Sequence, residues 1–468
     1  MMQWLIPLIL IAGLIFIHEL GHFLAAKFVG VKVEEFSIGF PPRIFAKKWG
    51  ETVYSVGILF LGGFVRLRGQ NIEDEDPKEK GNYASKGVGA KFLILIAGVF
   101  FNLVLAFALL AYVFWRGSEV PAFFYGPAIV QNVEEGTIAK KAGFLAQDQL
   151  IRFNEQNLAH WQDFERAFRN IKEQNLITVK RGSEEKTLPL NKEELTRSNF
   201  GLNPRVPAIV GGSMKNYPAE QANLKNGDRI LSINGFAVDS FGEVSPLMDR
   251  LQSQELKIEL FRPKTENFLE ESDSLESQAH FFAKLGAPVA KPNEGVSKKD
   301  FYSTQFGMEG EVFTLLLSPK LENGHYKIGI IPSVIKERHG FFESFGLAGK
   351  KLVSSVFALF DFFEKLFTGR VNKDEVGGPL MIFKIVSDAS SQGLSSIFQI
   401  AALISFQLAF FNLLPIPALD GGHILLLGYE FFRKKAPPPK IRARIQMAGM
   451  ILLLVLMIFL TWQDISRI

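Results

Sequence analysis

The sequence predicts a polytopic α-helical membrane protein with four transmembrane helices, a membrane-associated β-hairpin and two extracytoplasmic β-rich α+β domains. Four apolar stretches are long enough to cross a bilayer, and a soluble region between the second and the third contains an internal repeat. The chain is 47% hydrophobic and 21% charged, so apolar and polar residues must be segregated along it.

Composition excludes several classes of function. The net charge is only +4, and no basic tract is interleaved with aromatic residues, so we expect no nucleic-acid partner. The chain has no cysteine, which excludes disulfides and thiolate chemistry. A bound metal ion must therefore use nitrogen and oxygen ligands.

Residues 1–29 are predicted to form the first transmembrane helix, and they contain the motif HELGH. The segment lacks the basic start of a signal peptide, so we expect it to be retained. A strongly polar side chain near the bilayer centre costs about 2.5–3.5 kcal/mol, so His18, Glu19 and His22 need a compensating interaction.

A zinc ion would supply that interaction. Helical spacing of i and i+4 places the imidazoles of His18 and His22 on one face, where both can bind one zinc ion per chain. Glu19 lies beside them as a general base for metal-assisted peptide hydrolysis. The alternative is a chance pair of surface histidines, which the apolar flanks disfavour. Catalytic zinc sites use three protein ligands, so a third must come from elsewhere.

Residues 30–91 are predicted to form a cytoplasmic or membrane-dipping β region. Strand-like alternation covers residues 31–38 and 52–68, and the second stretch contains Gly62 and Gly63. A hairpin that dips toward the bilayer and an ordinary surface hairpin are equally compatible with this pattern. Residues 92–115 carry no charge and are predicted as the second transmembrane helix, with Asn102 expected to bond to a neighbouring helix.

The soluble region contains two copies of one module, at residues 126–204 and 205–335. An offset of 80 overlays residues 138–156 on 218–236 and matches Asp148 to Asp228. The second copy resembles a PDZ domain closely and the first more weakly, which implies binding of extended peptides at a sheet edge. A role as size filter or spacer is an equal alternative. Residues 263–305, rich in Glu, Ser and Lys, are predicted to be a loop insertion.

The C-terminal part returns to the membrane. Residues 341–367 are two-faced and are predicted as an amphipathic interfacial helix, with a core helix of a soluble module as the alternative. Residues 394–417 are predicted as the third transmembrane helix and lead to the motif LDG. Pro415 and Pro417 should make the helix end or unwind near residues 412–414. Asp420 in the broken segment that follows is the candidate third ligand, with His423 as a lower-ranked rival. Residues 443–462 are predicted as the fourth transmembrane helix.

Charge predicts the orientation. Residues 431–444 hold six basic side chains and no acidic one, so this connection is expected to be cytoplasmic. Four crossings then place both chain ends and the repeat outside the cytoplasm. The first and third helices both run inward, which brings HELGH and Asp420 to a similar depth in the cytoplasmic half of the bilayer.

HELGH in the first helix, the tandem PDZ-like repeat and NLLPIPALDGG in the third helix together resemble the site-2 protease family of intramembrane zinc metalloproteases. The likeness is to the bacterial branch that releases sigma factors by cutting membrane-bound anti-sigma proteins, and it covers nearly the whole chain apart from residues 263–305. Such a protein is expected in the bacterial cytoplasmic membrane, with an anti-sigma-like transmembrane protein as its substrate.

The resemblance implies roles for particular residues. His18, His22 and Asp420 would bind zinc and Glu19 would be the base. Residues that shape the substrate path would be Asn412, Pro415, Pro417, Gly62 and Gly63.

The sequence departs from the family pattern at Val99, where proline is common, and at Pro41 and Pro42. These departures affect local shape and substrate preference. The rival functions are a non-proteolytic membrane adaptor that binds partners through the PDZ-like modules and, more weakly, a transporter. Four crossings and no inverted repeat disfavour the transporter.

Overall fold

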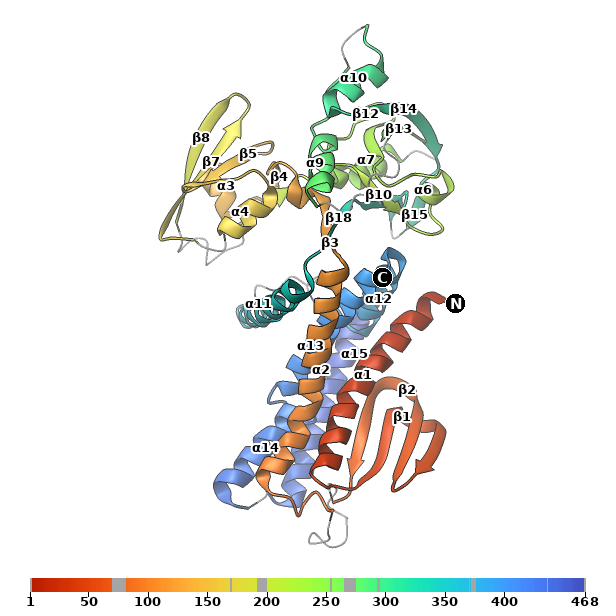
Figure 1. Cartoon of the computed structure of the whole chain (residues 1–468), viewed down its shortest axis with the longest axis vertical. Coiled ribbons are helices and arrows are strands. Elements are labelled where there is room, and N and C mark those ends of the chain that lie inside the picture. Colours follow the sequence, from red (N-terminus) through yellow and green to blue (C-terminus); the bar gives the residue numbers. More distant parts are fainter. Residues whose placement is uncertain are drawn as a thin grey trace. The chain divides into compact units, whose positions relative to one another are not determined.

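The structure is a computed structural model. In it the chain forms two compact units (Figure 1). One unit comprises Met1–Ser118 and Arg338–Ile468, and the other comprises Glu119–Glu337. The structure describes residues 2–69, 81–168, 171–191, 200–252, 255–264, 275–292, 295–322, 324–369, 371, 376–435 and 437–466.

Four helices of the first unit are long and apolar enough to cross a membrane, counting only the part of the chain that the structure describes. They lie within α1 (Met2–Phe28), α2 (Val88–Arg116), α13 (Leu394–Leu413) and α15 (Pro439–Ile465). Much of the apolar surface of α15 is exposed, including Met450, Val455 and Phe459. Exposed apolar side chains along a whole helix are the surface that lipid covers.

Helix α2 packs against α1 and α13, and the contact with α1 depends on glycine. A Cβ atom added to Gly21 would lie 2.4 Å from the carbonyl oxygen of Ala97, so the two helix backbones touch there. Small residues at such crossings let membrane helices approach closely. Gly21 therefore sets how near α1, with its polar cluster, comes to α2.

Strands β1 (Val33–Trp49) and β2 (Thr52–Leu67) form a sheet that folds back on itself. Residues 35–38 pair on one side with residues 53–56 and on the other with residues 63–66. The first part of β1 is mostly buried, whereas residues 40–49 are exposed. The predicted hairpin is thus present, but its first strand is longer than expected and its start lies in the middle of the sheet.

Helix α11 (Phe341–Phe367) projects sideways from the bundle beside α2 (Figure 1). It buries Ser344 and Ala348, while Phe342, Phe357 and Phe367 are more than two-thirds exposed. Small residues face protein and large aromatic ones face outward, which is the arrangement expected of a helix at a membrane surface.

Two shorter helices complete this unit. The sequence analysis did not foresee α12 (Pro379–Gln392), whose first turn donates backbone N–H groups of Gly378 and Met381 to the Asp464 carboxylate at 2.9 and 3.0 Å. Asp464 lies near the end of α15 and is 1% exposed. Helix α14 (Asp420–Arg433) follows the loop after α13.

The second unit contains two modules with the same strand order. The first has a four-stranded sheet in the order β6 (Gln156–Asn157), β5 (Gln149–Phe153), β7 (Gln174–Arg181), β8 (Glu184–Asn191). The second has the order β12 (Phe236–Ala237), β11 (Arg229–Ile233), β13 (Leu256–Pro263), β14 (Gly310–Leu317). Each also has a two-stranded sheet, β4 (Val130–Val133) with β9 (Leu202–Pro204), and β10 (Val210–Ser213) with β17 (Ile330–Pro332).

The remaining elements of this unit are short. The first module contains helices α3 (Ile138–Ala142) and α4 (Trp161–Phe168). The second contains α6 (Pro218–Gln221), η2 (Phe241–Glu243), α7 (Val244–Leu251) and the hairpin β15 (Lys320–Glu322) with β16 (His325–Lys327). Each module packs around its own hydrophobic core.

Equivalent ion pairs lie in the two modules. Arg181 donates two hydrogen bonds to the Asp148 carboxylate, both at 2.7 Å, and Arg262 does the same to Asp228 at 2.6 Å. Both aspartates are completely buried. The residues that the offset of 80 matched therefore have the same partners in both copies.

Residues 263–305 are not the loop that the sequence predicted. Within their described part they form α9 (Leu275–Leu285) and α10 (Lys298–Phe306), and residues 265–274 and 293–294 lie outside the described residues. Phe281, Phe282 and Phe306 are buried in a core with Phe261. The sequence analysis missed these helices because the segment is mostly polar, and only a few aromatic side chains pack into the core.

Candidate metal centre

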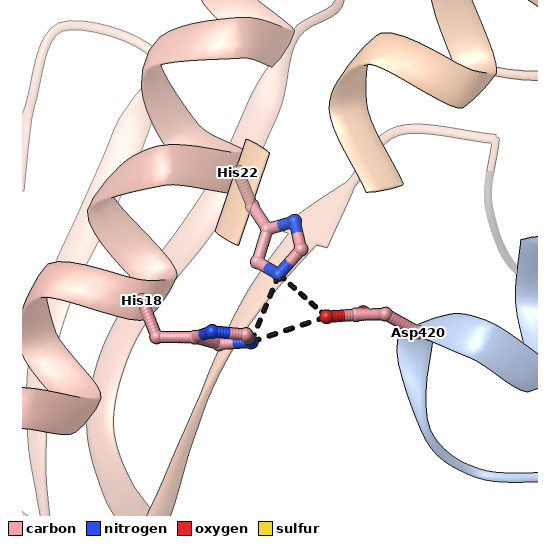
Figure 2. Close-up of side chains that lie close together, drawn as sticks. All are labelled: His18, His22 and Asp420. Carbon is pink, nitrogen blue, oxygen red and sulfur yellow. Dashed lines mark hydrogen bonds and ion pairs between the residues drawn. The ribbon is translucent and has the colours of Figure 1, made fainter. Parts of the chain in front are cut away.

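His18 and His22 lie one turn apart on α1 and are 7% and 9% exposed. Their Nε2 atoms are 3.2 Å apart, and both rings turn toward the start of α14 (Figure 2). The spacing of the motif therefore has the consequence that the sequence predicted, with two imidazole nitrogens converging on one point.

The loop between α13 and α14 delivers the third group. Helix α13 ends at Leu413, before Pro415 and Pro417, and the chain becomes helical again at Asp420. Asp420 was expected inside a broken segment, but it is the first residue of α14. Gly421 and Gly422 allow the turn because a Cβ atom on either would lie 2.2–2.3 Å from a backbone oxygen of residues 414 and 416.

Asp420 Oδ2 lies 3.2 Å from Nε2 of His18 and 3.3 Å from Nε2 of His22 (Figure 2). Ligands at the usual zinc distances in a tetrahedral site are about 3.3–3.5 Å apart, so this triangle fits one zinc ion. Oδ2 is buried and has no hydrogen-bond partner among the described residues, as expected of an oxygen whose partner is a cation.

In the described part of the chain, no other group of three or more histidine and acidic side chains has its ligand atoms close enough together to hold one metal ion. His423, the lower-ranked rival, is not a member of the cluster. It follows Asp420 by three positions on α14.

Helix α2 holds the rings in place. Nδ1 of His22 lies 2.8 Å from the carbonyl oxygen of Ile94 and donates to it, so Nε2 carries the lone pair whenever the ring is neutral. Gly98 lies one turn further along α2, where an added Cβ atom would be 2.3 Å from Nε2 of His22 and 2.9 Å from Cε1 of His18.

The sequence analysis missed both Ile94 and Gly98. A glycine inside an apolar membrane helix was the available signal for Gly98. A backbone carbonyl such as that of Ile94 leaves no trace in sequence.

Glu19 is 9% exposed and lies beside His18, His22 and Asp420, but it does not belong to their cluster. Within the described residues its carboxylate has no hydrogen-bond partner. A Cβ atom on Gly63 would lie 2.9 Å from Cγ of Glu19, so β2 passes directly against this side chain. Gly62 lies against the ring of Phe40. Of the two glycines, Gly63 is therefore the one in contact with Glu19.

The other predicted substrate-path residues lie on the chain that leads to Asp420. Asn412 is in the last turn of α13, and Pro415 and Pro417 are in the following loop. Among the described residues, no hydrogen bond or ion pair joins these three to the cluster of His18, His22 and Asp420. The carbonyl oxygen of Pro417 lies instead against Gly449 of α15.

Comparison of the sequence with known proteins identifies the class of protein to which this cluster of His18, His22 and Asp420 belongs. Residues 6–456 match the model of peptidase family M50. A putative zinc metalloprotease of Campylobacter jejuni is 30% identical, and the match covers 100% of this chain and 94% of that protein. Zinc metalloprotease RasP of Shouchella clausii is 27% identical over 97% of this chain and 96% of its own length. The regulator of sigma E protease of Haemophilus influenzae is 25% identical, with coverage of 98% and 97%.

The chain belongs to peptidase family M50, the site-2 protease family that the sequence resembles. It is a membrane zinc metalloprotease, and zinc is its cofactor. This excludes the non-proteolytic adaptor and the transporter as its principal activity.

Proposed function

We propose that the protein is an intramembrane zinc endopeptidase that hydrolyses peptide bonds in the transmembrane segments of single-span membrane proteins. One observation carries the proposal. The side chains of His18, His22 and Asp420 converge within 3.3 Å on elements that belong to a bundle of membrane-length helices, with Glu19 beside them. Water, a metal and a base are the groups that peptide hydrolysis requires.

In this proposal His18, His22 and Asp420 hold the zinc ion. When bound, zinc lowers the pKa of water and polarises the scissile carbonyl. Glu19 accepts the proton of the attacking water on its carboxylate and delivers it to the leaving amide nitrogen. Among the described residues no hydrogen bond occupies this carboxylate, which leaves it available for both transfers.

The substrate backbone would be held by β2. A transmembrane helix satisfies its own amide groups, so its scissile bond becomes accessible only after local unwinding. Gly63 lies against Glu19, and the sheet segment that contains it offers an edge on which an extended strand can pair. Asn412, Pro415 and Pro417 would shape the other side of the substrate path.

The H. influenzae relative is named a regulator of sigma E protease, which supports anti-sigma-type proteins as substrates here. We assign the chain to the bacterial cytoplasmic membrane, with the PDZ-like modules outside the cytoplasm and the metal centre toward the cytoplasmic half. The six basic residues of 431–444 support this orientation. The two modules would exclude intact substrates and admit those already shortened.

The test uses the full chain co-expressed with a single-span membrane reporter. Glu19→Gln should keep its zinc but slow cleavage by at least about 10²–10⁴-fold, because the general base is lost. Asp420→Asn should lose both zinc and cleavage. Glu364→Gln and Asp361→Asn on the exposed surface of α11 are the matched controls and should change neither.

Undiminished cleavage by Glu19→Gln would reject its role as the base. Full zinc content in purified Asp420→Asn would reject the ligand set. The two measurements are separate, so each assignment stands or fails by itself.

A further inference from the structure

Asn102 is the strongly polar residue in the middle of α2, and it is completely buried. Its side-chain amide nitrogen lies 3.2 Å from Nδ1 of His18. Its side-chain oxygen, Oδ1, is buried and has no hydrogen-bond partner among the described residues. The amide therefore faces the ring nitrogen of a proposed ligand, on the side away from the metal centre.

The two proposed histidine ligands are thus contacted by one face of α2. Ile94, Gly98 and Asn102 follow one another at intervals of four residues. The Ile94 carbonyl accepts from Nδ1 of His22, Gly98 leaves room for both rings, and Asn102 meets Nδ1 of His18. His22 has a partner that fixes its tautomer, and Asn102 is the only such partner in position for His18 among the described residues.

A neutral imidazole that binds a metal through Nε2 keeps its proton on Nδ1 and needs an acceptor there. A carboxamide has nearly the same shape after a rotation of 180° about its last bond, and this rotation replaces the N–H donor with the oxygen acceptor. The backbone of Asn102 is anchored meanwhile, because Ser405 of α13 donates from Oγ to its carbonyl oxygen at 2.9 Å.

We propose that Asn102 is a positioning residue whose Oδ1 accepts a hydrogen bond from Nδ1–H of His18 and so directs the Nε2 lone pair of His18 at the metal ion. The inference rests on the ligand set proposed above. It assigns to Asn102 a second role beyond the helix-to-helix bond that the sequence predicted.

The test measures metal affinity in the purified full chain, with zinc removed by a chelator and then restored in competition with a metal indicator. Asn102→Leu fills the same space but offers no acceptor, and its affinity for zinc should fall about 10- to 100-fold. Asn102→Asp offers only acceptors and should bind zinc within about threefold of the parent, as carboxylate–histidine–zinc arrangements do. The absorption spectrum of the cobalt-loaded chain should change in Asn102→Leu and persist in Asn102→Asp.

Gln399→Leu is the matched control, since Gln399 lies on α13 between Ser395, which bonds to Gly117, and Ser405, which bonds to Asn102. Its affinity should equal that of the parent. Thermal melting in excess chelator checks that all four metal-free proteins are folded before zinc is added.

Parent-like affinity of Asn102→Leu would overturn the proposal. Weak binding by Asn102→Asp would also overturn it, because Asn102 would then act as a donor. If Asn102→Leu does not fold, Asn102→Asp alone decides between these outcomes. Failure of the ligand set is recognised separately, because Asp420→Asn would then bind zinc as tightly as the parent.

Discussion

Gly98 has no side chain, and this leaves the space that the imidazole rings of His18 and His22 occupy in the candidate metal centre. Its Cα lies on the face of α2 that contacts α1, and an added methyl group would be 2.3 Å from Nε2 of His22. Real Cβ contacts do not become that short, so a side chain here must displace a ring or separate the two helices. The missing side chain is therefore as necessary to the site as the ligands.

Gly98→Ala is expected to lower zinc affinity by about 10- to 100-fold, because the methyl group competes with both ligands for position. Alanine is the better helix former by about 1 kcal/mol, so lost binding could not be attributed to a weaker helix. Zinc content and affinity of the purified protein are the measurements. Gly89→Ala on the same helix has open space around its added methyl group and serves as the control. Full affinity in Gly98→Ala would show that the rings have more room than the structure gives them.

The site residues that could be predicted from the sequence were those that belong to a recognisable local motif. HELGH identifies His18, Glu19 and His22 because helical spacing alone places them together, and Asp420 was recognised because prolines and glycines surround it. Gly98 and Asn102 have no such pattern. Each contacts a histidine that lies more than 70 positions away in the sequence, and only the packing of α1 on α2 shows that contact.

At the scale of elements, α14 carries Asp420, and a partly buried ion pair ties it to α2. Lys91 Nζ donates to Glu430 Oε1 at 2.7 Å, and the lysine side chain is 8% exposed. Helix α2 also contacts both histidine rings, so one helix fixes the position of all three proposed ligands. The sequence analysis placed Lys91 at the end of the β region and assigned it no role, because a single lysine at a helix start is ordinarily a surface residue.

Removing one partner of this pair should be worse than removing both. Lys91→Met leaves the Glu430 carboxylate partly buried without its partner, at a cost of about 1–3 kcal/mol. The double variant Lys91→Met with Glu430→Leu should recover most of that loss, since an apolar pair needs no partner. Thermal unfolding and zinc retention in detergent measure both effects. If the two single losses simply add in the double variant, the pair does not couple α14 to α2.

The long apolar helices, the helix end near Leu413 and the repeat in the soluble unit were all predictable, because hydrophobic length, proline chemistry and self-similarity are local features. Helix α12 and the two helices of residues 263–305 were not. The first turn of α12 depends on Asp464, more than 80 residues away, and α9 and α10 depend on a core that other segments supply.

At the scale of the whole molecule, the chain enters and leaves the soluble unit at two strands that pair, β3 (Ser118–Pro121) and β18 (Val334–Glu337). Helix α9 packs on both β18 and the 3-10 helix η1 (Ala122–Tyr125). Gln278 of α9 accepts from the backbone N–H of Lys336 at 3.1 Å. Helix α9 of the insertion therefore contacts both chain segments that connect the second unit to the first unit.

Phe282→Ala should therefore loosen these connecting segments. Phe282 is 3% exposed in the core that α9 shares with η1 and Ile335, and removing a buried phenylalanine side chain costs about 3–5 kcal/mol. Hydrogen exchange should accelerate by at least about tenfold at residues 120–125 and 333–337, while the sheet of the first module keeps its protection. The Ala122 amide is an informative probe, because it donates to the carbonyl oxygen of Ser333 at 3.0 Å.

Phe236→Ala is the matched control, since Phe236 belongs to the same module and is 48% exposed. Its exchange at the connecting segments should equal that of the parent. Exchange that rises equally throughout the second module in Phe282→Ala would mean that the insertion only stabilises its own module. A rise confined to the connecting segments would mean that it holds them, and cleavage of an intact, unshortened reporter should then increase if the modules exclude such substrates.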